Sequence, residues 1–175
     1  MYVSFGSEAG GSELFPRLYR AMLDQLGAMP IRVLMTVGQS ADPRLLGNLP
    51  ANAHVERWWP QTGLMRYAVA VVGHGGYGTS MTALAAGLPQ VLVPLFSLDQ
   101  HDNARRINEV GAGISLSEGL PAIGGLADAL PRVLEDRSYS VGARRIAAEM
   151  AALPPAAEAI GLLESLAHVV ISQKP

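Results

Sequence analysis

A glycine-rich loop between an apolar run and a helical segment constrains this chain more than any other feature. Residues 68–72 form a short, β-branched apolar run that predicts a buried strand. The loop at residues 73–78 follows, and the spacing of residues 79–86 predicts a helix. In such a unit, free backbone N–H groups and the positive end of the helix dipole point to one place. The unit therefore predicts an anion site, to which His74 and Thr79 can add hydrogen-bond donors.

The same loop matches the Gly-x-Gly-x-x-Gly fingerprint of dinucleotide-binding folds through Gly73, Gly75 and Gly78. Asp99 lies about 20 residues further on, where that fingerprint places an acidic residue. A single match is weak evidence, and a glycine turn that packs a helix against a sheet is the alternative. A P-loop is excluded, because no Gly-Lys-Ser/Thr is present.

Strands alternate with helices along the chain, which predicts a parallel doubly wound sheet. We expect one α/β domain over residues 1–175, a Rossmann-like sheet of about six strands with flanking helices and a helical C-terminus. Strands are predicted at residues 2–5, 31–37, 53–56, 68–72, 90–94 and 114–116. Helices are predicted at residues 13–27 with Ser12 as N-cap, 62–67, 79–86, 100–110 opened by Asp99, 123–135, 138–152 and 155–169.

Composition and charge exclude several classes of protein. Hydrophobic residues make up 49% of the chain and charged residues 16%, which is typical of a globular domain. No apolar run reaches the roughly 18 residues of a membrane span. The absence of cysteine fits a cytoplasmic protein, which is the location that we expect. A net charge of −2 gives no long-range attraction to nucleic acid. The absence of cysteine excludes disulfides, thiolate metal ligands and cysteine nucleophiles.

Side chains that follow the predicted strands are expected to gather at one edge of the sheet, where open α/β sheets bind ligands. Trp58 and Trp59 offer an aromatic plate for a planar base, and the glycine loop offers a cradle for a diphosphate. Asp99 and Gln100 can chelate neighbouring hydroxyls of a sugar. Together these residues predict a nucleotide-sugar site. Each also has a structural alternative: core or interface anchors for the tryptophans, a hydrogen-bonded structural histidine for His74, an N-cap for Asp99 and a surface amide for Gln61.

Four segments stand in a characteristic order: Trp58-Trp59-Pro60-Gln61, residues 71–79, residues 86–90 and Asp99-Gln100-x-x-Asn103-Ala104. Together they resemble family 1 glycosyltransferases, most closely the bacterial natural-product branch. Residues 2–7 resemble the first strand of that family's C-terminal domain, and residues 147–158 resemble its closing helices. The similarity covers essentially the whole chain.

The resemblance implies that this chain is the donor-binding half of a GT-B glycosyltransferase, and that the N-terminal acceptor domain is absent. Such enzymes invert the anomeric centre without a metal or cofactor, and transfer a (deoxy)sugar from a dTDP- or UDP-sugar to a hydroxyl of a small-molecule natural product. The general base belongs to the other half, so we assign no catalytic residue here. The chain also begins inside a predicted strand. We therefore expect it to bind nucleotide without turnover and to self-associate through the exposed cleft face.

The resemblance also assigns roles by position. It implies that Trp58 stacks on the donor base, with Gln61 in the same loop, and that His74 contacts the diphosphate. In the same way it implies a phosphate loop of Gly76, Gly78 and Thr79, with Ser7 near the phosphates and Asp99 and Gln100 holding the sugar hydroxyls. It implies no metal ligand. Many bacterial members carry two histidines in this loop, and here Gly73 stands in place of the first.

Two other functions compete with this one. The glycine fingerprint allows an NAD-dependent oxidoreductase domain, but three predicted strands precede the motif, whereas a dinucleotide fold usually carries it after the first. A non-catalytic subunit is the other alternative, like the small chain of two-chain N-acetylglucosaminyltransferases. The helical ending at residues 153–166 favours the natural-product branch over that subunit.

Overall fold

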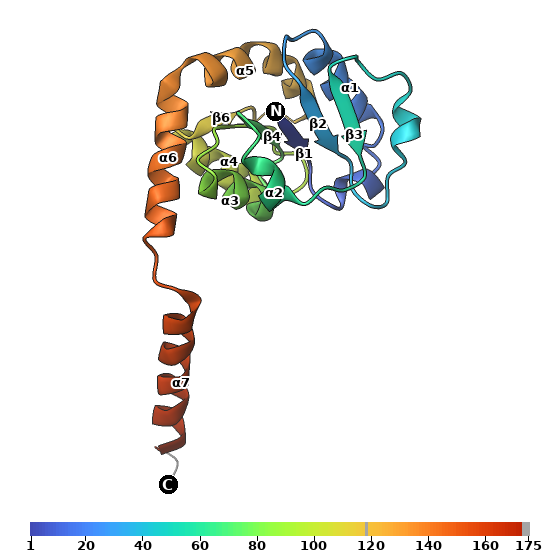
Figure 1. The fold of residues 1–175 in the computed structure, drawn as a ribbon. Coiled ribbons are helices and arrows are strands. Elements are labelled where there is room, and N and C mark those ends of the chain that lie inside the picture. Colours follow the sequence, from blue (N-terminus) through green and yellow to red (C-terminus); the bar gives the residue numbers. More distant parts are fainter. Residues whose placement is uncertain (118, 173–175) are drawn as a thin grey trace.

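The computed structural model describes residues 1–117 and 119–172 and contains one six-stranded sheet with helices on both faces (Figure 1). The sheet order is β3-β2-β1-β4-β5-β6, and every neighbouring pair is parallel. The strands are β1 (Tyr2–Ser4), β2 (Val33–Thr36), β3 (Ala53–Glu56), β4 (Val71–Gly73), β5 (Gln90–Leu92) and β6 (Gly113–Ser115). The order reverses between β1 and β4, which confirms the predicted Rossmann-like doubly wound fold.

Seven α-helices are present in the described part of the chain. They are α1 (Arg17–Gly27), α2 (Gln61–Met65), α3 (Tyr77–Ala85), α4 (Leu98–Glu109), α5 (Leu126–Glu135), α6 (Arg137–Ala151) and α7 (Ala156–Ser172). Short 3₁₀ turns lie at Ala9–Gly11, Pro43–Leu46 and Leu120–Gly125.

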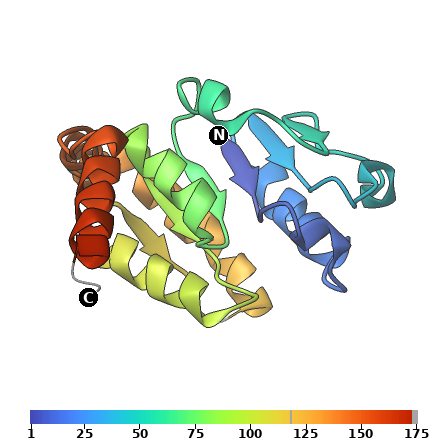
Figure 2. The same ribbon diagram turned by 90° about the horizontal axis from the view of Figure 1, so that it is seen from below.

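Two apolar layers hold the sheet, because successive side chains of a strand point to opposite faces. Val72 packs in the layer that includes side chains of α1 and α5. Its neighbour Val71 packs in the layer formed with α2 and α3. Figure 2 shows β1–β3 with α1 beside the half of the molecule that carries α3 and α4. The boundary between these halves runs between β1 and β4, and the two strands pair directly there.

Several predicted boundaries were wrong, and three of them have a clear local reason. The first helix begins at Arg17, because Ser12 Oγ donates back to the Ala9 carbonyl (2.7 Å) and does not cap a helix. Strand β4 begins at Val71, because the Ala68 N–H bonds the Met65 carbonyl and completes the turn after α2. The N-cap of α4 is Ser97, and Asp99 lies inside the first turn.

Helix α7 extends away from the sheet (Figure 1). Its side chains Ile160, Leu162 and Leu163 are exposed. Within residues 1–117 and 119–172, no helix combines the length and the apolar character needed to cross a membrane.

Candidate functional site

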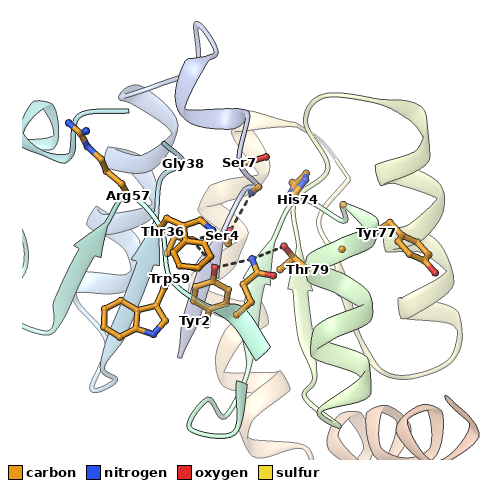
Figure 3. Close-up of a pocket in the computed structure, with 15 residues that line it drawn as sticks. Tyr2, Ser4, Ser7, Thr36, Gly38, Arg57, Trp59, His74, Tyr77 and Thr79 are labelled. Atoms are coloured by element: carbon orange, nitrogen blue, oxygen red, sulfur yellow. Dashed lines mark hydrogen bonds between the residues drawn. The ribbon is translucent and has the colours of Figure 1, made fainter. Parts of the chain in front are cut away.

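A cleft of about 480 Å³ lies where the strand order reverses, at the carboxyl ends of β1, β2 and β4 (Figure 3). Crossover connections leave the sheet in opposite directions at such a point, and the crevice between them is where doubly wound folds bind ligands. The cleft is lined by Tyr2, Ser4, Gly6, Ser7, Thr36, Gly38, Arg57, Trp58, Trp59, Gln61, His74, Gly76, Tyr77, Gly78 and Thr79.

The aromatic end of the cleft is formed by the loop after β3. The exposed fractions of Trp58 and Trp59 are 58% and 42%, which excludes the alternative that these indoles are core anchors. Arg57 precedes them and is also exposed. Large exposed indoles in a crevice are suited to stacking against a planar ring. In Figure 3, Trp59 lies on one side of the cleft and His74 on the other, with Tyr2 and Thr36 between them.

The other end of the cleft is formed by the start of α3. Gly76 is the N-cap, and the Ser80 N–H is the first to bond back along the helix, to the Gly76 carbonyl (3.1 Å). The N–H groups of residues 76–79 precede that bond and have no partner within the helix. With the helix dipole they create a positive potential in the cleft. None of the residues that line the cleft is Asp or Glu, so no carboxylate there repels an anion.

His74 lies between the two glycines that make room for its ring. A Cβ at Gly76 would lie 2.6 Å from the ring Cε1, and a Cβ at Gly6 would lie 3.1 Å from the same atom. Burial lowers the pKa of His74, while the Ser4 backbone and the Asp99 carboxylate oppose that shift. The side chain is therefore a neutral imidazole at pH 7, able to donate through one ring nitrogen.

One nitrogen of the His74 ring has no hydrogen-bond partner among the described residues. That nitrogen is Nδ1, and it is buried. The ring lines the wall of the cleft, and a structural histidine stays an alternative to a contact with a ligand.

The loop before α3 is tied to α4. Gly75 adopts φ +82°, and a Cβ there would lie 2.6 Å from the Gln100 carbonyl oxygen. The Asn103 Nδ2 donates to the Gly75 carbonyl (2.9 Å). These contacts hold the loop so that His74 and the start of α3 face the same space.

The floor of the cleft contains a hydrogen-bonded group of polar side chains, of which the sequence did not single out Tyr2, Ser4 and Thr36. Tyr2, Ser4 and Thr36 are buried at the ends of β1 and β2. The Tyr2 hydroxyl lies 2.7 Å from Thr36 Oγ1, and Gln61 Nε2 donates to both Tyr2 (3.0 Å) and Thr79 Oγ1 (3.2 Å). The available signal was the presence of hydroxyl side chains within otherwise apolar strands.

The cleft brings together most of the site residues predicted from the sequence. Those that line it are Ser7, Trp58, Gln61, His74, Gly76, Gly78 and Thr79. Asp99 and Gln100 are not among the lining residues. Asp99 is exposed in the first turn of α4, near enough to His74 for its charge to affect that pKa.

Gln100 is buried, and its Oε1 accepts the Leu95 N–H (3.3 Å) and the Phe96 N–H (3.0 Å). It lines a smaller cavity of about 350 Å³ that adjoins the cleft and shares Gly6, Ser7 and His74 with it. The contact of Asp99 and Gln100 with a sugar stays a prediction. Within the described residues, no three His, Asp or Glu side chains are grouped closely enough to hold a metal ion.

Comparison with known proteins adds an independent line of information. Residues 20–166 match the family described as "Erythromycin biosynthesis protein CIII-like, C-terminal domain". The chain is 37% identical over 146 residues to L-demethylnoviosyl transferase of Streptomyces niveus, covering 83% of this chain and 38% of that protein.

Solved structures that are similar to this chain are also those of glycosyltransferases. The glycosyltransferase SnogD of Streptomyces nogalater superposes with a TM-score of 0.76 at 31% identity, covering 95% of this chain and 43% of that one. The spinosyn rhamnosyltransferase SpnG complexed with thymidine diphosphate gives a TM-score of 0.82 at 27% identity, covering 93% of this chain and 45% of that one.

The fold and the cleft define a Rossmann-like α/β domain whose cleft has exposed indoles at one end and the N-terminus of α3 at the other. The chain belongs to the erythromycin biosynthesis protein CIII-like C-terminal domain family, which occurs in GT-B glycosyltransferases of antibiotic biosynthesis. The predicted family is thereby confirmed. The chain spans 38% of the length of the curated relative named above.

Proposed function

We propose that this chain is the nucleotide-sugar-binding half of an inverting, metal-independent glycosyltransferase. The sugar donor is a dTDP- or UDP-linked (deoxy)sugar, and the acceptor is a hydroxyl of a small-molecule natural product bound by an N-terminal half. One observation carries the proposal: a single cleft at the β1–β4 reversal has exposed indoles at one end and the N-terminus of α3 with His74 at the other. A nucleoside diphosphate has the matching order, a flat base and then two phosphates.

The geometry supports a role in stabilising the leaving group. Charge develops on the diphosphate as its bond to the sugar breaks, and preorganised donors at that position lower the barrier. The N–H groups at the start of α3, the His74 ring and the Thr79 hydroxyl are such donors. The proton of the acceptor hydroxyl must pass to a general base within hydrogen-bond reach, a role that we place in the N-terminal half.

A calorimetric titration of the chain with dTDP, UDP and NAD⁺ tests the proposal. We expect saturable one-site binding of dTDP or UDP, much weaker binding of NAD⁺, and no change in affinity when a chelator removes divalent metal. Tighter binding of NAD⁺ than of either diphosphate would favour the oxidoreductase alternative. Loss of dTDP binding in the presence of the chelator would contradict metal independence.

Replacing Trp58 by alanine is expected to weaken dTDP binding by roughly 1–3 kcal/mol, the range for stacking of a base on an aromatic side chain. Trp59→Ala is the matched comparison, since the two indoles are adjacent and both line the cleft. Calorimetry on both variants measures the effect. Unchanged affinity in Trp58→Ala, with a loss in Trp59→Ala, would move the base to Trp59.

Replacing His74 by alanine is expected to weaken dTDP binding more than thymidine binding, by about 1.5–3 kcal/mol for a charge-assisted contact. A bound diphosphate favours the protonated ring, whereas burial lowers the pKa of the free form below 6.5. Binding therefore takes up a proton, and the affinity should rise as the pH falls from 7 toward that lowered pKa. His74→Gln keeps an N–H donor but cannot titrate, so it should lose this dependence. Equal losses for dTDP and thymidine in His74→Ala would argue for a structural histidine.

A further inference from the structure

The hydrogen bonds in the floor of the cleft have one consistent direction. Thr36 has a single hydroxyl proton, which it donates to Ser4 Oγ at 3.1 Å. The hydrogen bond of 2.7 Å between Tyr2 and Thr36 must then use the proton of Tyr2. With that proton committed, the Tyr2 oxygen accepts, and Gln61 Nε2 donates to it at 3.0 Å.

This direction determines what the floor presents to a ligand. The second N–H of the Gln61 amide goes to Thr79 Oγ1 at 3.2 Å, so both amide protons are used and Oε1 is left as an acceptor. Thr79 accepts from Gln61 and keeps its own hydroxyl proton. Among residues 1–117 and 119–172 the structure provides no acceptor for that proton, and Thr79 lies at the start of α3, where the anion is expected.

We propose that Tyr2 is a positioning residue. Through Gln61 it determines which groups in the cleft donate hydrogen bonds to a ligand and which accept them. With the Tyr2 hydroxyl in place, Gln61 presents an acceptor toward the middle of the cleft and Thr79 presents a donor toward the diphosphate. Without that hydroxyl the amide is free to turn, and Thr79 then gives its proton to Gln61 Oε1 instead of to a phosphate oxygen. This inference rests on the proposed function, because it takes a nucleoside diphosphate as the ligand.

We call the hydrogen-bonded series Thr36, Tyr2, Gln61 and Thr79 the relay. The relay also spans the boundary between the halves of the sheet. Tyr2 and Thr36 belong to β1 and β2, whereas Gln61 begins α2 and Thr79 lies in the first turn of α3. Tyr2 is 1% exposed and Thr36 is 5% exposed, so bulk water cannot readily replace a lost partner. In such a buried network the loss of one hydroxyl reorients the remaining partners.

The test is a double-mutant cycle with dTDP as the probe. Tyr2→Phe removes the hydroxyl and keeps the ring, and we expect about threefold to tenfold weaker binding, as for one net hydrogen bond. If Tyr2 acts through Gln61, the same change in a Gln61→Ala background should alter the affinity less than twofold. Equal losses in both backgrounds, or no loss in the wild-type background, would overturn the proposal.

Tyr19→Phe is the matched control. Tyr19 is a second buried tyrosine, its hydroxyl bonds the Val37 carbonyl at 3.5 Å, and it does not line the cleft. Its loss should leave the dTDP affinity unchanged in both backgrounds. Thr36→Val provides a second test of the relay, because it removes the acceptor of the Tyr2 proton and should show the same dependence on Gln61.

Proton exchange in the ligand-free chain separates this inference from the proposed function. Because both Gln61 Nε2 protons are bonded, their NMR signals should exchange slowly with solvent, and Tyr2→Phe should speed the exchange at least tenfold. Unchanged exchange would overturn the relay even if dTDP binds. The wild-type chain could fail to bind dTDP and UDP while the exchange result is as expected. That outcome would overturn the proposed function and the donor and acceptor roles toward the diphosphate, but it would leave the relay in place.

Discussion

The 175-residue chain is expected to bind a dTDP-sugar and to form no glycosylated product. Holding two substrates together across a cleft can lower a barrier by roughly 7–11 kcal/mol, and a single half positions only the donor. None of the residues that line the cleft can be assigned as the acceptor base. Incubation with a panel of dTDP-sugars and mixed aglycones, followed by mass spectrometry, measures the outcome.

A two-domain glycosyltransferase carried through the same panel is the positive control. Substantial turnover by the isolated chain would contradict the prediction. His101, exposed on α4 and nearest to the cleft in sequence among the other histidines, would then be the first residue to replace. Sedimentation of the same sample tests the expectation that the chain self-associates through the exposed cleft face.

Replacing Gly75 by alanine is expected to lower the free energy of unfolding by about 2–5 kcal/mol. At φ +82° an alanine is strained, and its Cβ would lie 2.6 Å from the backbone oxygen of Gln100, which no side-chain rotation relieves. The loop would have to move, and His74 moves with it. Denaturant unfolding and dTDP titration of the same sample should therefore both show a loss.

Gly63→Ala is the control for the glycine substitution. Gly63 lies inside α2, and a Cβ there would meet no atom within 4 Å. Alanine in a helix interior is favoured over glycine by roughly 0.5–1 kcal/mol, so this variant should be slightly more stable than wild type. A Gly75→Ala protein as stable as Gly63→Ala would show that the loop conformation is not required for the fold.

The strand and helix pattern could be predicted from the sequence because it depends on local periodicity. Apolar runs gave all six strands, with ends shifted by up to three residues. The start of α1 was missed because Ser12 bonds backward to Ala9, a choice that capping preferences do not resolve. The reversal between β1 and β4 could not be predicted from periodicity, because strand order depends on which crossovers pack over which face.

The site could be predicted where a residue's role depends on its own loop. His74, Gly76, Gly78 and Thr79 follow one strand, and the start of α3 brings them together. Roles that depend on a partner far away in the sequence could not be predicted in this way. Tyr2 and Gln61 are 59 residues apart, and only the fold shows that they are hydrogen-bonded.

Gln100 is a site residue whose hydrogen-bond partners could not be predicted from the sequence. Its type and spacing suggested an amide open to a sugar, but its Oε1 accepts from the backbone N–H groups of Leu95 and Phe96. Such local bonds to backbone are a common use of amide side chains and are not visible in spacing.

A crystal structure of the chain with dTDP tests the central claim most directly. We predict the thymine ring stacked on Trp58, and the diphosphate within hydrogen-bonding distance of His74 and the N–H groups of residues 76–79. Density for the nucleotide in the adjoining cavity beside Phe5 and Phe96, with the start of α3 empty, would contradict the account.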